Sequence, residues 1–192
     1  MTVKVGLLSL AHMHAYSYAQ ALNSLTDSEL VGVYDPDPKR GKQGAKDMDT
    51  TFFSEPEELL KQVDAVIVCS ENSRHREFTE LAAKYGCHVL CEKPIATTLE
   101  DGRAMIKACE KANVKLMIAF PVRFSAPVIQ LKKMLEEGAV GDVLAIRGTN
   151  HGQLPGGWFV DPELAGGGAV LDHTVHVVDL IRWFFDRELI SV

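Results

Sequence analysis

The chain has 192 residues, and its 20 Lys and Arg against 26 Asp and Glu give a formal net charge of −6. Hydrophobic residues make up 46% and charged residues 24%, values of an ordinary globular protein that exclude a disordered or collagen-like chain. The acidic balance argues against a nucleic-acid partner, which needs clustered Lys and Arg, and no run of 18 apolar residues is present to span a membrane.

Apolar runs alternate with helical patterns through residues 1–120. Because the strand-like runs are apolar throughout and helical stretches of about 10–15 residues separate them, the pattern predicts a parallel sheet covered on both faces. The predicted fold class is therefore α/β, with a doubly wound parallel sheet. Strands are expected at 3–8, 30–34, 52–53, 64–69, 88–91 and 115–119, and helices at 12–25, 39–46, 74–85 and 99–112.

The pattern changes after Pro121. Helices are expected at 127–137 and 170–185, a strand at 143–147, a long glycine-rich loop at 148–168, and the opening of another strand at 189–192. Two helices with so little strand would leave open sheet edges and a small core. Residues 121–192 are therefore expected to be the N-terminal part of a second α/β domain, which is incomplete here or completed by another chain.

Four cysteines, Cys69, Cys87, Cys91 and Cys109, form no Cys-x-x-Cys pair, and three of them lie in apolar runs. We interpret them as buried, reduced thiols, which favours a cytoplasmic protein over a metal or redox role. The N-terminus runs directly into a strand pattern and lacks the long apolar region of a signal peptide.

The loop after the first strand is a candidate nucleotide site, because ligands of a doubly wound sheet bind beyond the carboxyl ends of its strands. Ser9, Ala11 and His14 stand where a dinucleotide-binding motif has glycines. The following helix still offers free amide groups to an anion beside His12. The alternative is an ordinary strand-to-helix turn.

The loop after the second strand supplies Asp35, whose carboxylate can accept hydrogen bonds from a ribose diol and repel a 2′-phosphate. This favours NAD over NADP, although Lys39 and Arg40 lie nearby and blur the preference. The same side chain could instead cap the helix that follows, since Asp-Pro often starts a helix.

Two further loops at this edge carry polar side chains. Ser70 and Asn72 follow the fourth strand, and short side chains there can reach a pyrophosphate or the nicotinamide ribose, or cap the next helix. Lys93 leaves the fifth strand beside Glu92 and could donate hydrogen bonds to a substrate hydroxyl or carbonyl. A solvated turn is the alternative for this pair.

A glycine-rich segment, 166–168, precedes Asp172 and His176, which are four residues apart and share one helical face. A histidine with a carboxylate one turn away suits general acid–base chemistry near neutral pH, although a purely structural histidine is the alternative. A metal site of Asp172, His173 and His176 is disfavoured because the first two are expected to point apart. We therefore predict no metal.

Several of these elements occur together and in order: Glu92-Lys93-Pro94, the stretch from Arg123-Phe124 to Gly141-Asp142-Val143, and Gly166-Gly167-Gly168 followed by Asp172 and His176. In this combination the chain resembles the Gfo/Idh/MocA family, named for glucose–fructose oxidoreductase, inositol dehydrogenase and the rhizopine catabolism protein MocA. The resemblance runs over the whole chain. Asn72 and His75 are similar to the family's Asn-x-x-His, although Glu71 stands where proline is usual.

The resemblance implies a Rossmann domain at 1–120 and a substrate domain from 121, with NAD, or alternatively NADP, as cofactor. It implies hydride transfer at a carbinol carbon of a sugar, inositol or related polyol, and a homo-oligomer if the second domain is complete. By analogy Lys93, Asp172 and His176 form the catalytic trio. An NAD-dependent glycosidase-type enzyme and a non-catalytic nucleotide-binding sensor remain alternatives.

The expected ligand contacts fall into two groups, one for the cofactor and one for the substrate. Trp158 in particular is either a stacking platform for a sugar face or part of the core. The cofactor-binding set is Ser9, Ala11, His12, Asp35, Arg40, Ser70, Asn72, His75, Glu92 and Lys93. The substrate-binding set is Lys93, Arg123, His151, Trp158, Asp172 and His176.

Overall fold

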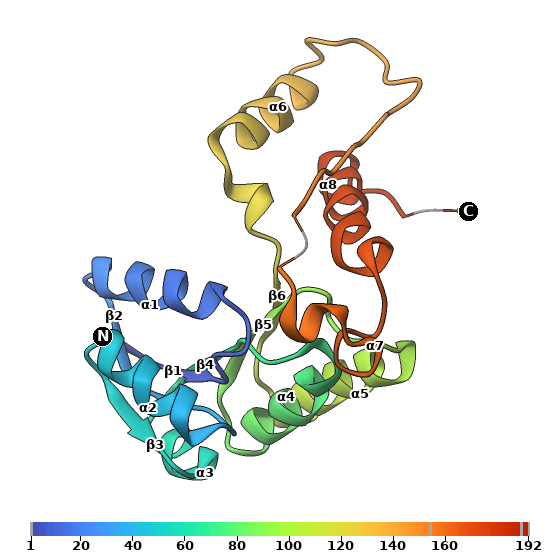
Figure 1. The fold of residues 1–192 in the computed structure, drawn as a ribbon. Helices are drawn as coiled ribbons and strands as arrows, with labels where there is room; N and C mark the ends of the chain where they lie inside the picture. The colour runs from blue at the N-terminus through green and yellow to red at the C-terminus, as the bar shows by residue number, and fades with distance from the viewer. Residues whose placement is uncertain (1, 154, 189, 192) are drawn as a thin grey trace.

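The N-terminal part of the chain is built around one parallel sheet. The structure is a computed structural model that describes all residues except Met1, Leu154, Leu189 and Val192. Its strands are β1 (Val3–Leu8), β2 (Ser28–Tyr34), β3 (Thr51–Phe53), β4 (Ala65–Val68), β5 (His88–Glu92) and β6 (Leu116–Ala119). They pair in parallel in the order β3-β2-β1-β4-β5-β6 (Figure 1). The predicted doubly wound α/β fold is confirmed, with the strand order reversing between β1 and β4.

Each face of the sheet has its own apolar core, because successive side chains of a strand point to opposite faces. Leu7 belongs to a buried cluster with residues of α1 and α2, whereas its neighbour Leu8 belongs to a cluster with residues of α3, α4 and α5. Coverage on both sides explains why the strands are apolar throughout. The helices are α1 (His14–Ser24), α2 (Pro38–Asp47), α3 (Pro56–Leu60), α4 (His75–Lys84) and α5 (Leu99–Ala112).

The four cysteines are buried and free, as the sequence predicts. Burial raises the pKa of the Cys87 thiol to about 11, so this group stays protonated and unreactive at neutral pH. Within the described part of the chain, none of the helices combines the length and apolar character needed to cross a bilayer.

After β6 the chain leaves the sheet and returns to its carboxyl edge. In Figure 1, α6 and the long trace that follows it extend away from the sheet, and α7 lies back against the N-terminal part. The predicted loop at 148–168 therefore contains two short helical segments. The elements are η2 (Pro121–Phe124), α6 (Ala126–Glu136), η3 (Gly157–Val160), α7 (Pro162–Ala165), the π-helical η4 (Val170–Thr174) and α8 (Val175–Phe185).

The strand expected at 143–147 is wrong: this stretch is irregular. Leu144 is 94% exposed, and no strand among the described residues lies beside this segment to pair with it. Without a neighbouring strand, the backbone N–H and C=O groups of an apolar run cannot form the hydrogen bonds of a sheet. Local sequence preference alone therefore does not make this run a strand. The strand expected to open at 189–192 falls on Leu189 and Val192 and lies outside the described residues.

Gly166 follows α7 and packs closely against the segment that follows β5. It has a φ of +74°, and a Cβ atom there would lie 2.1 Å from Cγ2 of Thr97. Gly168 is not in the left-handed region, and a Cβ there would meet nothing within 4 Å.

We therefore expect Gly166→Ala to lower the free energy of unfolding by about 1–3 kcal/mol, because alanine adds both backbone strain and a clash. Gly168→Ala, the matched control, should change it by less than about 0.5 kcal/mol. Urea denaturation of both variants makes the comparison. Equal losses in the two variants would show that the close approach of Gly166 to Thr97 does not contribute to stability.

Candidate active site

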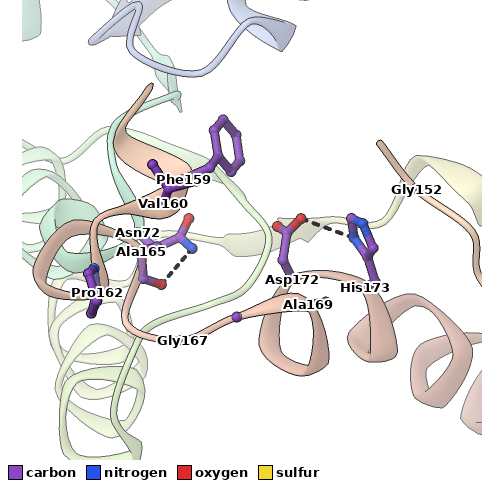
Figure 2. A pocket seen from close by; sticks show the side chains of 11 residues that line it. Asn72, Gly152, Phe159, Val160, Pro162, Ala165, Gly167, Ala169, Asp172 and His173 are labelled. Atoms are coloured by element: carbon purple, nitrogen blue, oxygen red, sulfur yellow. Dashed lines mark hydrogen bonds and ion pairs between the residues drawn. The ribbon is translucent and has the colours of Figure 1, made fainter. Parts of the chain in front are cut away.

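Two adjoining cavities lie where the carboxyl edge of the sheet meets the C-terminal segment. The larger, of about 570 Å³, is mainly apolar and lies between Asn72 and Phe159 on one side and Asp172 with His173 on the other (Figure 2). The smaller, of about 270 Å³, is lined mostly by residues with polar side chains. Phe159, Asp172 and His173 line both cavities. The smaller one is also lined by His12, Met13, His14, Lys93, Val122, Asn150, Gln153, Pro155 and His176.

Lys93 and Asp172 form an ion pair at the wall of the smaller cavity. Lys93 follows β5 and is 6% exposed, and its Nζ lies 2.5 Å from Oδ1 of Asp172 in η4. The second carboxylate oxygen of Asp172 lies 3.0 Å from Nδ1 of His173. Asp172 therefore contacts both Lys93 and His173. The expectation that the side chains of Asp172 and His173 point apart is wrong. The π-helical turn of η4 replaces the α-helical spacing on which that expectation rested.

His176 reaches the same cavity from the first turn of α8. Its Nδ1 is buried and has no hydrogen-bond partner among the residues the structure describes. Burial lowers the pKa of the imidazole, and the positive charge of Lys93 lowers it further. His176 is therefore a neutral base at neutral pH. The structure brings Lys93, Asp172 and His176 to one cavity, as the sequence predicts.

Glu92 is buried near the cavity, and its carboxylate accepts hydrogen bonds from three groups. Its Oε1 accepts a hydrogen bond from the Tyr18 hydroxyl at 2.6 Å and lies 2.9 Å from Nδ1 of His14, while Oε2 accepts from the Lys93 amide at 3.2 Å. Burial raises the pKa of Glu92, but the hydrogen bonds with His14 and Tyr18 outweigh it, so the pKa lies below its ordinary value. Sequence reasoning missed His14 and Tyr18 as site residues. The sequence did contain a signal for them: His14 and Tyr18 are four residues apart on the helix after β1, a spacing that places both side chains on one helical face.

Asp35 is buried at the end of β2, and the protein itself occupies its carboxylate. Its Oδ2 accepts hydrogen bonds from the Leu10 amide at 2.6 Å and Arg40 Nε at 2.9 Å, and its Oδ1 accepts from the Asp37 amide at 2.8 Å. The alternative of a helix cap is wrong for Asp35, because Asp37 caps α2. Asp35 instead connects the loop after β1 with Arg40 through hydrogen bonds.

A free carboxylate oxygen remains beside this pair. Glu71 follows β4, and its Oε1 lies 3.9 Å from a terminal nitrogen of Arg40. Its Oε2 is buried without a hydrogen-bond partner in the described part of the chain. Such an unpaired buried acceptor is costly unless a ligand satisfies it. Glu71 is therefore a second candidate acceptor for a ribose hydroxyl, next to Asp35, which stays a prediction.

The remaining cofactor candidates lie at or under the strand ends. Ser9 is buried with a φ of +66°, so it adopts the conformation for which glycine is usual at this turn. Asn72 lines the larger cavity and donates to the Ala165 carbonyl at 3.0 Å (Figure 2). Ser70 is buried and donates to the Glu71 carbonyl. His75 is fully buried, and its Nδ1 donates to the Pro94 carbonyl at 2.9 Å, so it supports the Lys93-Pro94 turn from inside.

The substrate candidates outside the trio lie apart from the cavities. Arg123 forms a two-point ion pair with Asp179 of α8, and His151 is exposed and lines neither cavity. Trp158 donates to the Ala11 carbonyl at 3.0 Å and stacks on Phe159 with ring centroids 3.8 Å apart. Phe159, which the sequence analysis did not select, is the aromatic side chain that this stack presents to both cavities.

His12 is the most strongly perturbed histidine of this loop. It is 3% exposed, and burial lowers its pKa to about 4. Its Nδ1 accepts a hydrogen bond from the His14 amide at 3.2 Å, which requires the neutral ring.

The unfolded chain therefore binds a proton at His12 near pH 6.5, whereas the folded chain does so only near pH 4. As pH falls from 6.5 to 4, this site should remove about 3 kcal/mol from the free energy of unfolding. His12→Asn, whose amide oxygen can accept the same hydrogen bond, should lack this part of the pH dependence. Denaturation of both proteins at several pH values measures it, and parallel pH curves would contradict the assignment.

Comparison with known proteins gives a consistent result for both parts of the chain. Residues 3–120 match the GFO/IDH/MocA model described as an oxidoreductase family with an NAD-binding Rossmann fold, and residues 128–192 match the GFO/IDH/MocA C-terminal domain model. The chain is 37% identical over 169 residues to 1,5-anhydro-D-fructose reductase of Ensifer adhaerens, covering 85% of this chain and 51% of that protein. It is 30% identical over 193 residues to myo-inositol 2-dehydrogenase of Thermotoga maritima, covering 99% and 57%.

Solved structures show the same similarity. Aldose-aldose oxidoreductase from Caulobacter crescentus, complexed with glycerol, is 31% identical with a TM-score of 0.84, over 98% of this chain and 59% of that one. The WlbA dehydrogenase from Bordetella pertussis, in complex with NADH and UDP-GlcNAcA, is 27% identical with a TM-score of 0.79, over 96% and 55%. The chain spans about half the length of the curated relatives it matches.

Proposed function

The chain belongs to the Gfo/Idh/MocA oxidoreductase family, and from this premise we propose that it is an NAD-dependent dehydrogenase acting on a carbinol carbon of a sugar, inositol or related polyol. The observation that carries the proposal is the meeting of Lys93, Asp172 and His176 at one cavity beside an NAD-binding Rossmann sheet. When bound, the coenzyme supplies the acceptor or donor of the hydride.

Each of the three side chains has a separate role in the proposed reaction. His176, neutral because burial and Lys93 lower its pKa, takes the proton of the hydroxyl that is oxidised. The Lys93 ammonium donates a hydrogen bond to the same oxygen and stabilises the negative charge that develops there. Asp172, 2.5 Å from Lys93 Nζ, fixes the position of that ammonium group. In the reverse direction His176 returns the proton.

The coenzyme end of the site favours NAD over NADP. Arg40 contacts both Asp35 and Glu71, and Glu71 keeps one buried oxygen without a hydrogen-bond partner among the described residues. That oxygen can accept a hydrogen bond from a ribose hydroxyl. Two carboxylates against one guanidinium leave a net negative charge, which disfavours a 2′-phosphate. Ser9, Asn72 and Lys93 complete the proposed binding edge.

Absorbance of the reduced coenzyme, followed with a panel of polyols and glycosides, tests the proposal. Formation of NADH with a polyol supports it, and a slower reaction with NADP would agree with the charge at Arg40. Cleavage of a glycoside without net NADH would replace it by a glycosidase-type enzyme. Coenzyme binding with no turnover of any compound would replace it by a sensor.

We also place the protein in the cytoplasm, where thiols such as its four buried cysteines stay reduced. The resemblance to the family further suggests a homo-oligomer assembled through the second domain. Light scattering of the purified protein measures that assembly.

A further inference from the structure

We propose that His14 binds a second hydroxyl group of the substrate, so that the smaller cavity selects vicinal diols. This inference rests on the proposed function and specifies its substrate class. It starts from a side chain outside the trio: His14 also lines the cavity that holds Lys93 and His176.

Glu92 determines which nitrogen of His14 carries the proton. The carboxylate is ionised and can only accept hydrogen bonds, so Nδ1 of His14, 2.9 Å from Oε1, must be the donor. Tyr18 donates to the same oxygen, and the Lys93 amide donates to the other. The carboxylate therefore holds the ring through Nδ1, and Nε2 is the ring nitrogen that remains for a ligand.

Nε2 is free to meet a ligand. It has no hydrogen-bond partner among the described residues, and the side chain is 39% exposed while its carboxylate partner is fully buried. The ring of His12 lies against it, with centroids 4.2 Å apart, and limits its movement. A ring nitrogen held in a fixed position at the wall of this cavity suits the hydroxyl of a bound molecule, which can both donate and accept a hydrogen bond.

A metal site is the competing explanation of the same cluster. His12, His14 and Glu92 place potential ligand atoms within 4.8 Å of one another. However, Nδ1 of His12 accepts a hydrogen bond from the His14 amide, so its other nitrogen carries the proton and cannot ligate. The oxygens of Glu92 are also filled by three donors. The hydrogen-bond pattern thus favours an imidazole–carboxylate pair over a metal centre.

Of the four histidines that line the cavity, His176 and His14 would each bind one hydroxyl. His176 takes the proton of the hydroxyl that is oxidised, and Nε2 of His14 forms a hydrogen bond with the hydroxyl on the neighbouring carbon. The second hydroxyl is bound and does not react. Sugars and inositols carry such adjacent hydroxyls, whereas a simple secondary alcohol does not.

Two substitutions separate the two ends of the His14 ring. His14→Asn places an amide group near the position of Nδ1, which keeps a donor to Glu92 but leaves nothing at Nε2. His14→Gln reaches the position of Nε2. We compare kcat/KM for the best polyol and for its deoxy analogue, which lacks the neighbouring hydroxyl. His14→Asn should lose about 10- to 100-fold on the polyol and less than about 2-fold on the analogue, and His14→Gln should recover part of the loss.

A second readout needs no turnover. In wild-type protein labelled with ¹⁵N-histidine, adding the polyol in the presence of NADH should move the Nε2 resonance of His14, and adding the deoxy analogue should not. Equal losses of kcat/KM on polyol and analogue would overturn the inference, because His14 would then serve the fold. Weaker NADH binding in His14→Asn would overturn it in favour of a coenzyme contact. Uptake of Zn²⁺ that His14→Asn abolishes would overturn it in favour of a metal.

The failure of the two proposals is distinguishable. If the wild-type protein oxidises no polyol, the proposed function fails and the inference fails with it. If it oxidises polyols but His14→Asn lowers kcat/KM equally for the diol and for its deoxy analogue, only the inference fails.

Discussion

Replacing Lys93 by methionine is expected to lower kcat/KM by about 10²- to 10⁴-fold, because the ammonium group that stabilises charge on the reacting oxygen is removed. The substitution also leaves Asp172 without its closest partner. Asp172 keeps its contact with His173, so we expect the free energy of unfolding to fall by only about 1–3 kcal/mol. Steady-state kinetics and urea denaturation measure the two effects separately.

Lys133→Met is the matched control, because Lys133 lies near Glu137 on the exposed surface of α6 and lines neither of the two cavities. It should leave kcat/KM within about 2-fold, as expected for a surface ion pair. A Lys93→Met protein that binds NADH normally and retains more than a tenth of the wild-type kcat/KM would remove Lys93 from the catalytic trio.

Replacing His176 by asparagine should lower kcat for polyol oxidation by about 10²- to 10⁴-fold while leaving the affinity for NADH unchanged. In the wild-type protein, burial and the charge of Lys93 lower the pKa of this histidine. Oxidation needs the unprotonated ring, so the rate should fall only when pH drops through that lowered pKa. The acid limb of the pH profile is therefore expected below 6.5, and the variant should lack it.

His88→Asn is the control for this experiment. His88 is exposed at the start of β5, at the end of the strand away from the cavities, and its substitution should leave the pH profile unchanged. An acid limb that persists unaltered in His176→Asn would assign the proton transfer to another group. An acid limb above pH 6.5 in the wild-type protein would contradict the environment described for His176.

Most of the sheet could be predicted from the sequence, because its strands are buried on both faces and signal themselves as uninterrupted apolar runs. The position of the site followed from the same fact, since Asn72, Lys93 and the loop after β1 all follow strands whose carboxyl ends meet at one edge. The run at 143–147 has a similar local signal but no neighbouring strand among the described residues. A strand depends on its partner, and a single sequence does not supply that information.

The details that the sequence analysis missed depend on contacts between distant residues. The sequence indicated Asp35 as a ribose acceptor, but it did not reveal that Leu10 and Arg40 bind its Oδ2 or that Glu71 keeps a buried oxygen without a partner among the described residues. Similarly, the role of His14 depends on Glu92, which is 78 positions further along the chain. A residue type indicates what a side chain can do, whereas its partners determine which of its atoms remain free for a ligand.

Transfer of deuterium from a labelled substrate tests the central claim most directly. A polyol that carries deuterium on its carbinol carbons is incubated with the purified protein and oxidised NAD, and the coenzyme is then analysed by mass spectrometry and NMR. We expect one deuterium at C4 of the nicotinamide ring with the wild-type protein and only a trace with Lys93→Met or His176→Asn. Coenzyme that is bound but gains no deuterium from any polyol or sugar would contradict the account.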